Sequence, residues 1–374
     1  GISCEAQGET LGNLRALAAM AHCWRSDIES GYRMSVAALP LIRRTSRWEC
    51  IVLFHGTWSS LVLGREDDFV AMATQLVAAQ PDAGARRDYL LWCPLAASLL
   101  TSYGRRELAR DLLARVSDLL ADEVEVDPNI VGAQAVGRSD YVRAFERSPF
   151  EPLLLTRDAV KAFEQIGDRR NLVTAQSRLG QAQSELGDPD AAEQTLRGAV
   201  ALAERIRVPF ALLQAELHLA ALLCKSPAAD HRAEAVAIAT KVLGTQGVGL
   251  GYCGWARGIQ AQVLLHEGDG LGAERESRAA LELCRHVPLR RLWVLTLLIR
   301  SLLHRSQTEE ARTLAAEIPA AIAWLGGGGY IEIEAYLAAA KAAQAAGAVN
   351  EAHSLLQRFR AADGNGDVTF SGQL

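Results

Sequence analysis

Apolar and polar residues alternate with helical spacing along most of the chain, and the helical runs come in pairs. Residues 179–209, LGQAQSELGDPDAAEQTLRGAVALAERIRVP, show the plan: a helical run, a Gly-Asp-Pro-Asp turn and a second helical run that ends at Pro209. Gly187 permits the sharp corner, and Pro189 suits the first turn of the second helix. Small residues such as Gly180 stand where two helices must approach closely. The stretch therefore predicts a helical hairpin.

The same plan recurs throughout the chain. We expect hairpin corners near residues 26, 64, 104, 148, 187, 227, 268, 306 and 347. A spacing of about 40 residues, with a helical pattern on both sides of each corner, is typical of stacked hairpins that are too small to fold alone. The sequence predicts an all-α solenoid of about nine helix-turn-helix hairpins over residues 1–362, followed by a polar tail at 363–374.

The prolines agree with this division. Seven of the eleven prolines lie at predicted breaks, where the missing N–H costs no helical hydrogen bond. Pro94 and Pro319 fall inside helical patterns, and we expect a kink at each. The seven prolines at breaks are Pro149, Pro189 and Pro227 within hairpins, and Pro81, Pro128, Pro209 and Pro288 between hairpins.

The stretch GTQGVGLGYCGWARG contains a GxGxxG pattern at Gly249, Gly251 and Gly254. A dinucleotide fingerprint requires a strand before its glycines, but here an alanine-rich helical pattern, HRAEAVAIATKVL, precedes them. The stretch LGGGGY at 325–330 occupies the equivalent place two repeats later. We therefore interpret the glycines as a loop between hairpins and expect no bound cofactor.

The small and large positions Leu179-Gly180, Ala192, Leu196 and Ala199 resemble the signature of the tetratricopeptide repeat (TPR). The spacing is longer than the usual repeat of about 34 residues. The segment at 159–188, AVKAFEQIGDRRNLVTAQSRLGQAQSELGD, is similar to the repeat regions of large bacterial signalling proteins, namely serine/threonine kinases and AAA-type or STAND signalling ATPases. The resemblance implies a right-handed superhelix that binds proteins.

Catalytic motifs are absent from the sequence. It contains no GxxxxGK[ST], HRD or DFG, so kinase or ATPase activity is not expected of this chain. The eight histidines are dispersed without a metal-binding spacing. Asp363, Asn365 and Asp367 have the 1-3-5 spacing of a calcium loop, but Val368 and Leu374 replace the required Gly and Glu. We therefore expect a protein that is not an enzyme and carries no metal.

Net charge, apolar runs and cysteine placement indicate which partners and which cellular compartment the chain is suited to. The net charge of −5 gives no electrostatic reason for binding nucleic acid or an anionic membrane. No apolar run approaches the ~20 residues of a membrane-spanning helix. The seven cysteines are scattered, without any CxxC pair. Their placement favours reduced thiols in the cytoplasm.

In TPR superhelices the first helix of each hairpin lines the concave face, which points to a candidate binding surface. Arginine, histidine and tryptophan are frequent there, and such residues suit an acidic or aromatic peptide. The alternative interpretation is that Trp255 and Trp293 pack between hairpins. The candidate residues are Gln181, Glu185, Trp255, Gln262, His266, Trp293, Arg300, His304, Glu334 and Lys341.

Two functional hypotheses follow. The first is a non-catalytic protein–protein interaction scaffold, the sensory and partner-docking arm of a bacterial signalling kinase or ATPase. The second is a small-molecule-sensing repeat domain of an ATP-dependent transcription regulator. An open polar channel would favour the first hypothesis, and a closed apolar pocket would favour the second.

Overall fold

The computed structural model describes residues 6–121, 125–146 and 148–362. Within these ranges the regular structure is entirely helical. The expected all-α solenoid of stacked TPR-like hairpins is confirmed. The assignment of residues 1–362 to one continuous superhelix stays a prediction.

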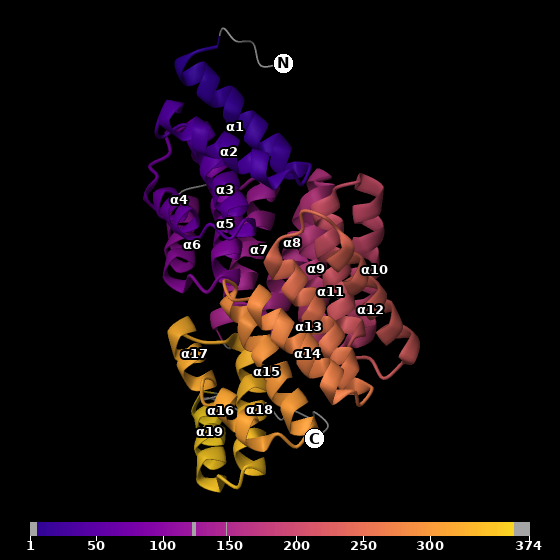
Figure 1. Ribbon diagram of the computed structural model, residues 1–374. Helices are drawn as coiled ribbons and strands as arrows, with labels where there is room; N and C mark the ends of the chain where they lie inside the picture. The colour runs from indigo at the N-terminus through magenta and orange to yellow at the C-terminus, as the bar shows by residue number, and fades with distance from the viewer. Residues whose placement is uncertain (1–5, 122–124, 147, 363–374) are drawn as a thin grey trace.

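Most of the helices form antiparallel pairs, and consecutive pairs stack along the chain (Figure 1). The first helices are α1 (Gly8–Trp24), α3 (Arg47–Val62), α5 (Arg86–Ser102), α7 (Pro128–Phe145), α9 (Arg169–Glu185), α11 (Pro209–Leu223), α13 (Leu250–His266), α15 (Pro288–His304) and α18 (Gly329–Ala345). The second helices are α2 (Ile28–Ala38), α4 (Glu66–Ala78), α6 (Arg106–Leu120), α8 (Glu151–Ile166), α10 (Pro189–Ile206), α12 (Ala229–Gly244), α14 (Gly270–Leu283), α16 (Thr308–Ala315) and α19 (Val349–Ala362). The short helices η1 (Leu39–Leu41) and α17 (Ile318–Leu325) complete the set.

The pair α9–α10 shows how the sequence specifies a hairpin. The Asp188 side chain caps α10 by accepting a hydrogen bond from the backbone N–H of Ala191, and Pro189 occupies the first turn. Gly180 of α9 faces Leu196 of α10 so closely that a β-carbon at position 180 would lie 2.5 Å from the Leu196 side chain. The small-residue position in the repeat pattern therefore sets the distance between the two helices.

The prolines that were predicted to kink helices behave differently from each other. Pro94 remains inside α5, and its carbonyl lies directly against Gly137 of α7, where a side chain would overlap it. At Pro319 the chain does not continue as one kinked helix. Helix α16 ends at Ala315 and α17 begins at Ile318, with Pro319 in the first turn of α17. The break occurs there because proline lacks the N–H that a helix interior requires. The prediction of a single kinked helix there is wrong.

The GxGxxG stretch lies at a junction between two hairpins. It follows a helix, α12, and Gly249 is the N-cap of α13, while Gly251 and Gly254 lie within α13. A side chain at Gly254 would overlap the thiol of Cys284, so this glycine permits close contact between α13 and the end of α14. No strand precedes the glycines among the described residues.

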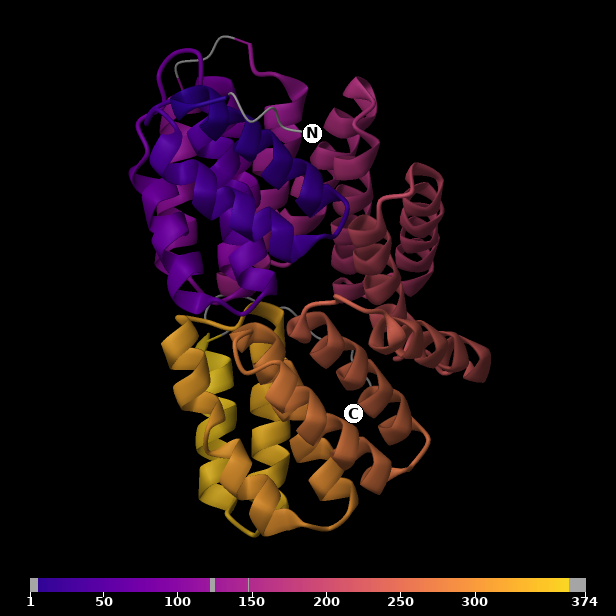
Figure 2. The same cartoon turned by 45° about the horizontal axis from the view of Figure 1, so that its top comes forward.

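The two ends of the array meet. In Figure 2 the N-terminal helices (indigo to purple) lie above the C-terminal helices (orange to yellow), and the middle helices connect them at one side. One hydrophobic core contains residues of both ends, including Leu100 of α5 and Leu325 of α17. At the contact of α18 with α7, Gly329 has a φ of +50° and lies against the carbonyl of Arg143. The ends of the array therefore approach each other and partly enclose the concave interior.

Within the described residues, no helix has both the length and the apolar character needed to cross a membrane. The described cysteines are all free thiols, and burial accounts for the raised pKa of most of them. Cys93, beside Pro94 in α5, is fully buried in the core.

Candidate functional site

The first helices of the hairpins surround two cavities of about 190 Å³ each in the concave interior. They share the side chains of Ser102, Arg178, His218, Trp255 and Arg290. We call the first the aromatic cavity, because its walls include Trp24, Phe54, Trp58, Trp92, Phe210, Tyr252 and Trp255. We call the second the polar cavity, because its walls include Asp140, Arg143, Gln181, Glu185, Lys225, Tyr330 and Glu334.

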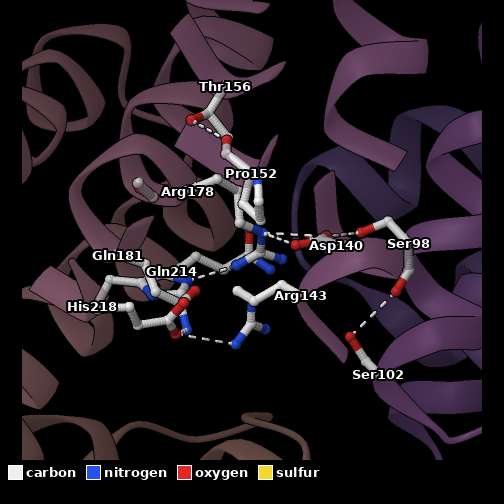
Figure 3. A network of polar contacts seen from close by, with 12 residues as sticks. Ser98, Ser102, Asp140, Arg143, Pro152, Thr156, Arg178, Gln181, Gln214 and His218 are labelled. Atoms are coloured by element: carbon white, nitrogen blue, oxygen red, sulfur yellow. Dashed lines mark hydrogen bonds and ion pairs between the residues drawn. The ribbon is translucent and has the colours of Figure 1, made fainter. Parts of the chain in front are cut away.

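A polar network lies where the two cavities adjoin (Figure 3). The Nε of Arg178 is 2.8 Å from one oxygen of Asp140, and Ser98 donates a hydrogen bond to the other oxygen. The Nη1 of Arg178 lies 2.6 Å from Nε2 of His218. Burial and the charge of Arg178 hold the pKa of His218 well below its usual value, so the neutral imidazole accepts this hydrogen bond. The network fixes the Arg178 guanidinium between α7 and α11.

The aromatic cavity has a continuous wall of rings. The ring centroids of Trp58 and Phe210 are 4.7 Å apart, and those of Phe210 and Tyr252 are 5.6 Å apart. A second group on α3 and α5 pairs Phe54 with Trp92 at 4.8 Å. Trp58 lies on α3, whereas Phe210 and Tyr252 lie on α11 and α13. Because these hairpins are far apart in the sequence, the wall exists only because the array curves back on itself. Such a wall suits a flat apolar group.

Positive charge accompanies the rings. The Arg170 guanidinium lies 4.5 Å from the ring centroid of Trp24, and that of Arg290 lies 4.8 Å from the centroids of both Tyr252 and Trp255. Among the described residues, no Asp or Glu lines the aromatic cavity, and neither arginine forms an ion pair. Burial lowers the pKa of Arg170. The cavity therefore combines an apolar surface with two guanidinium groups that form no ion pair with a described carboxylate, while a third, that of Arg178, is paired with Asp140.

In the polar cavity the charges are paired. Arg143 is 3.3 Å from Glu185, and Lys225 is 3.4 Å from Glu334. Gln181 donates a hydrogen bond to Glu185. Burial raises the pKa of Glu185 despite these contacts. Because each carboxylate already has a basic partner, this cavity offers less net charge to a ligand than the aromatic cavity.

The structure brings part of the predicted binding surface together. Gln181, Glu185, Trp255, Trp293 and Glu334 line the polar cavity. The others lie outside both cavities: Gln262 is buried and accepts a hydrogen bond from Arg300, while His266, His304 and Lys341 are exposed. Trp293 also packs against Gly258, as the alternative interpretation expected. Binding by these residues stays a prediction.

The sequence analysis missed the aromatic cavity. Trp58 and Trp92 lie on α3 and α5, first helices of hairpins whose repeat pattern is weaker than that around residues 187 and 268. Assigning first helices by corner position alone would have placed both on the concave face. Nothing in the sequence, however, indicates that Trp58 meets Phe210 of a distant hairpin.

Metal binding has no support in the described part of the chain. No group of three or more His, Cys, Asp or Glu side chains there is arranged to hold a metal ion. The calcium-like spacing of Asp363, Asn365 and Asp367 lies outside the described residues.

No family model matches the chain, and no curated protein matches it. Among solved structures, a Rap protein complexed with Competence and Sporulation Factor is similar to the chain with a TM-score of 0.61 at 11% identity, covering 85% of this chain and 88% of that one. NprR in complex with its cognate peptide NprX gives a TM-score of 0.46 at 11% identity, covering 94% and 90%. A STAND protein with a tetratricopeptide repeat sensor from Pyrococcus horikoshii gives 0.36 at 10% identity, covering 96% and 53%. The resemblance of this chain to TPR-like arrays is confirmed at the level of fold.

Proposed function

We propose that the chain is a non-catalytic recognition scaffold that binds a short protein or peptide segment in its concave interior. The observation that carries the proposal is the aromatic cavity, in which rings from distant hairpins surround Arg170 and Arg290 without a described carboxylate. Buried aromatic and arginine side chains are the residue types that contribute most to binding energy at protein interfaces. The Rap protein complexed with Competence and Sporulation Factor supports the proposal, since it is a complex built on the same fold.

The proposal includes a signalling role. The aromatic cavity is lined by residues from α1 to α15, so a bound segment contacts hairpins that are far apart in the sequence. Occupancy would change the preference of the array for its closed form, and an attached kinase or ATPase domain would sense that change. The free, mostly buried thiols favour a cytoplasmic location for this system.

A second candidate function is the sensing of a small molecule in the same place. The observation that favours it is that the aromatic cavity is partly enclosed and its walls are mainly apolar, which is typical of small-ligand sites. Both candidates use the same interior, so a test of the site comes before a test of the ligand class.

The test is to block the aromatic cavity. Thr174 of α9 is half-buried in its wall, whereas Thr74 of α4 is exposed and lies outside both cavities. Peptides would be selected on the purified chain by display and then titrated calorimetrically against the Thr174→Trp and Thr74→Trp variants. We expect affinity to fall at least about tenfold with Thr174→Trp, because the indole occupies the binding volume. Thr74→Trp should leave it unchanged.

Circular dichroism of both variants would verify that they are folded. Equal peptide affinity of the two folded variants would contradict the proposal. Selection that yields no peptide, together with loss of small-molecule binding in Thr174→Trp only, would favour the second candidate.

A further inference from the structure

One of the three arginines that line the aromatic cavity, Arg290, lies beside the start of α13. The guanidinium of Arg290, a residue of α15, lies over the rings of Tyr252 and Trp255, which belong to the first two turns of α13. A β-carbon built on Gly251 would lie 3.3 Å from Nη1 of Arg290 and 3.9 Å from the hydroxyl oxygen of Tyr103. The absence of a side chain at position 251 therefore lets the guanidinium approach the backbone of the first helical turn.

This helix start has no side-chain cap. The N-cap residue of α13 is Gly249, which has no side chain to accept from the first N–H groups. The helices α11 and α15 also begin at the cavity, with Phe210 and Val287 in its wall, and neither has a side-chain cap. The N-terminal ends of these helices carry partial positive charge, which adds to that of Arg290. Together they favour an anion at this end of the cavity.

Independent of the helix ends, two buried side chains in the wall have unused hydrogen-bonding atoms. His55 is fully buried, and its Nδ1 donates to the carbonyl of Ile51 at 2.8 Å, which leaves Nε2 with a free lone pair. Trp92 is 7% exposed, and its indole N–H has no partner. The free lone pair of His55 requires a donor and the Trp92 N–H requires an acceptor, so water or a neutral polar group of a ligand would complete them, and a carboxylate would not complete His55. The His55 and Trp92 rings are 5.2 Å apart, which places both groups in one part of the wall.

A chain of ring contacts leads from Arg290, where the anion would bind, to Trp58. Tyr252, beneath Arg290, is in contact with Phe210, which in turn is in contact with Trp58. A ligand with its anionic group at Arg290 would place an attached ring on this path.

We infer that the aromatic cavity binds a carboxylate attached to an aromatic group, with the carboxylate held by Arg290 at the start of α13 and the ring held by Phe210 and Trp58. This inference rests on the proposed function, because it names the ligand chemistry of the same site. A guanidinium binds a carboxylate through two parallel charge-assisted hydrogen bonds, and within the aromatic cavity no described carboxylate of the protein competes for Arg290. The chemistry has two sources, a free aromatic acid and a peptide whose C-terminal residue is aromatic.

The experiment is a calorimetric titration of the full chain with two matched pairs of probes. One pair is N-acetyl-phenylalanine and its neutral amide. The other is the peptide Ala-Ala-Ala-Phe with a free carboxylate and the same peptide amidated. We expect each acid to bind at least about tenfold more tightly than its amide, because only the acid forms the charged pair. Comparison of the two acids identifies the source, since the preferred source binds more tightly.

Variants at one helix provide the residue-level test. Arg290→Gln should weaken binding of the acids by about 10- to 100-fold and leave the amides unchanged, and Arg290→Lys should recover part of the loss because it keeps the charge. Arg291→Gln is the matched control, since Arg291 lies on the same helix, forms a surface ion pair with Glu317 and lines neither cavity. It should bind like the wild type.

Equal affinity for acid and amide, failure of both acids to bind, or equal effects of Arg290→Gln and Arg291→Gln would overturn the inference. The proposed function is tested separately, by the Thr174→Trp variant. If display-selected peptides lose binding in Thr174→Trp but do not depend on a carboxylate or on Arg290, the recognition site stands and only its assigned chemistry is wrong.

Discussion

Arg106 of α6 donates a hydrogen bond to the carbonyl oxygen of Gly326, which lies 220 residues further along the chain. Beside this contact, Leu325 lies close to Gly104. These contacts join the loop and second helix of the third hairpin to the end of α17, so the array is closed between its ends (Figure 2). In the same array Trp58 of α3 lies against Phe210 of α11 in the aromatic cavity, and the function proposed above depends on that contact between distant hairpins.

The closure should be sensitive to Gly329. Its positive φ and its contact with the Arg143 carbonyl leave no room for a β-carbon, so Gly329→Ala should destabilise the protein by about 2–4 kcal/mol. Gly198→Ala is the matched control, since nothing lies within 4 Å of the added methyl group in α10. It should stabilise the protein by about 0.5–1 kcal/mol. The free energies of unfolding in urea would be compared, and equal values for the two variants would contradict the assigned contact.

The network between the cavities should be costly to interrupt. Asp140→Asn leaves the buried guanidinium of Arg178 without its counter-ion, and we expect a loss of about 3 kcal/mol in the free energy of unfolding. Asp158→Asn changes an exposed carboxylate that is 3.9 Å from Lys161, so its effect should be below about 0.5 kcal/mol. Urea denaturation of both variants measures the difference. A small effect at Asp140 would mean that the network contributes little to holding α7 against α9.

Stability should depend on pH through His55. Burial lowers the pKa of His55 from 6.5 to about 4, because the protonated form is disfavoured inside the protein. Between these values the unfolded chain takes up a proton that the folded chain does not, so the free energy of unfolding falls as the pH decreases from 6.5 toward 4. The full contribution of the residue across this window is about 3 kcal/mol.

The variant His55→Asn keeps a donor for the Ile51 carbonyl and removes the titration. Its free energy of unfolding should therefore fall less steeply than that of the wild type between pH 6.5 and 4. Parallel curves for His55→Asn and the wild type would show that this imidazole titrates normally.

Local signals in the sequence predicted the hairpins. The spacing of the two helices depends on Gly180, the corner between them on Gly187 and the start of the second helix on Pro189. Because these residues lie close together in the sequence, the hairpin is recognised without knowledge of any distant contact. The end of α16 was not predicted, since the pattern around Pro319 continues helically and only packing decides between a kink and a break.

The candidate site was predicted less well than the fold. Trp255 and Glu185 were placed on the concave face because their helices follow the repeat pattern closely. Arg300 and His304 occupy similar positions in the sequence, but their end of α15 extends beyond the cavities. The pairing of Trp58 with Phe210 depends on the curvature summed over several hairpins, which no local pattern contains.

The most direct test of recognition in the concave interior is hydrogen–deuterium exchange of the chain with and without a display-selected peptide. The account predicts that peptide binding slows exchange in the N-terminal turns of α11, α13 and α15, which border the aromatic cavity. The outward second helices α4, α10 and α12 should exchange as in the free chain. Protection confined to those second helices, with none at the starts of α11, α13 and α15, would contradict it.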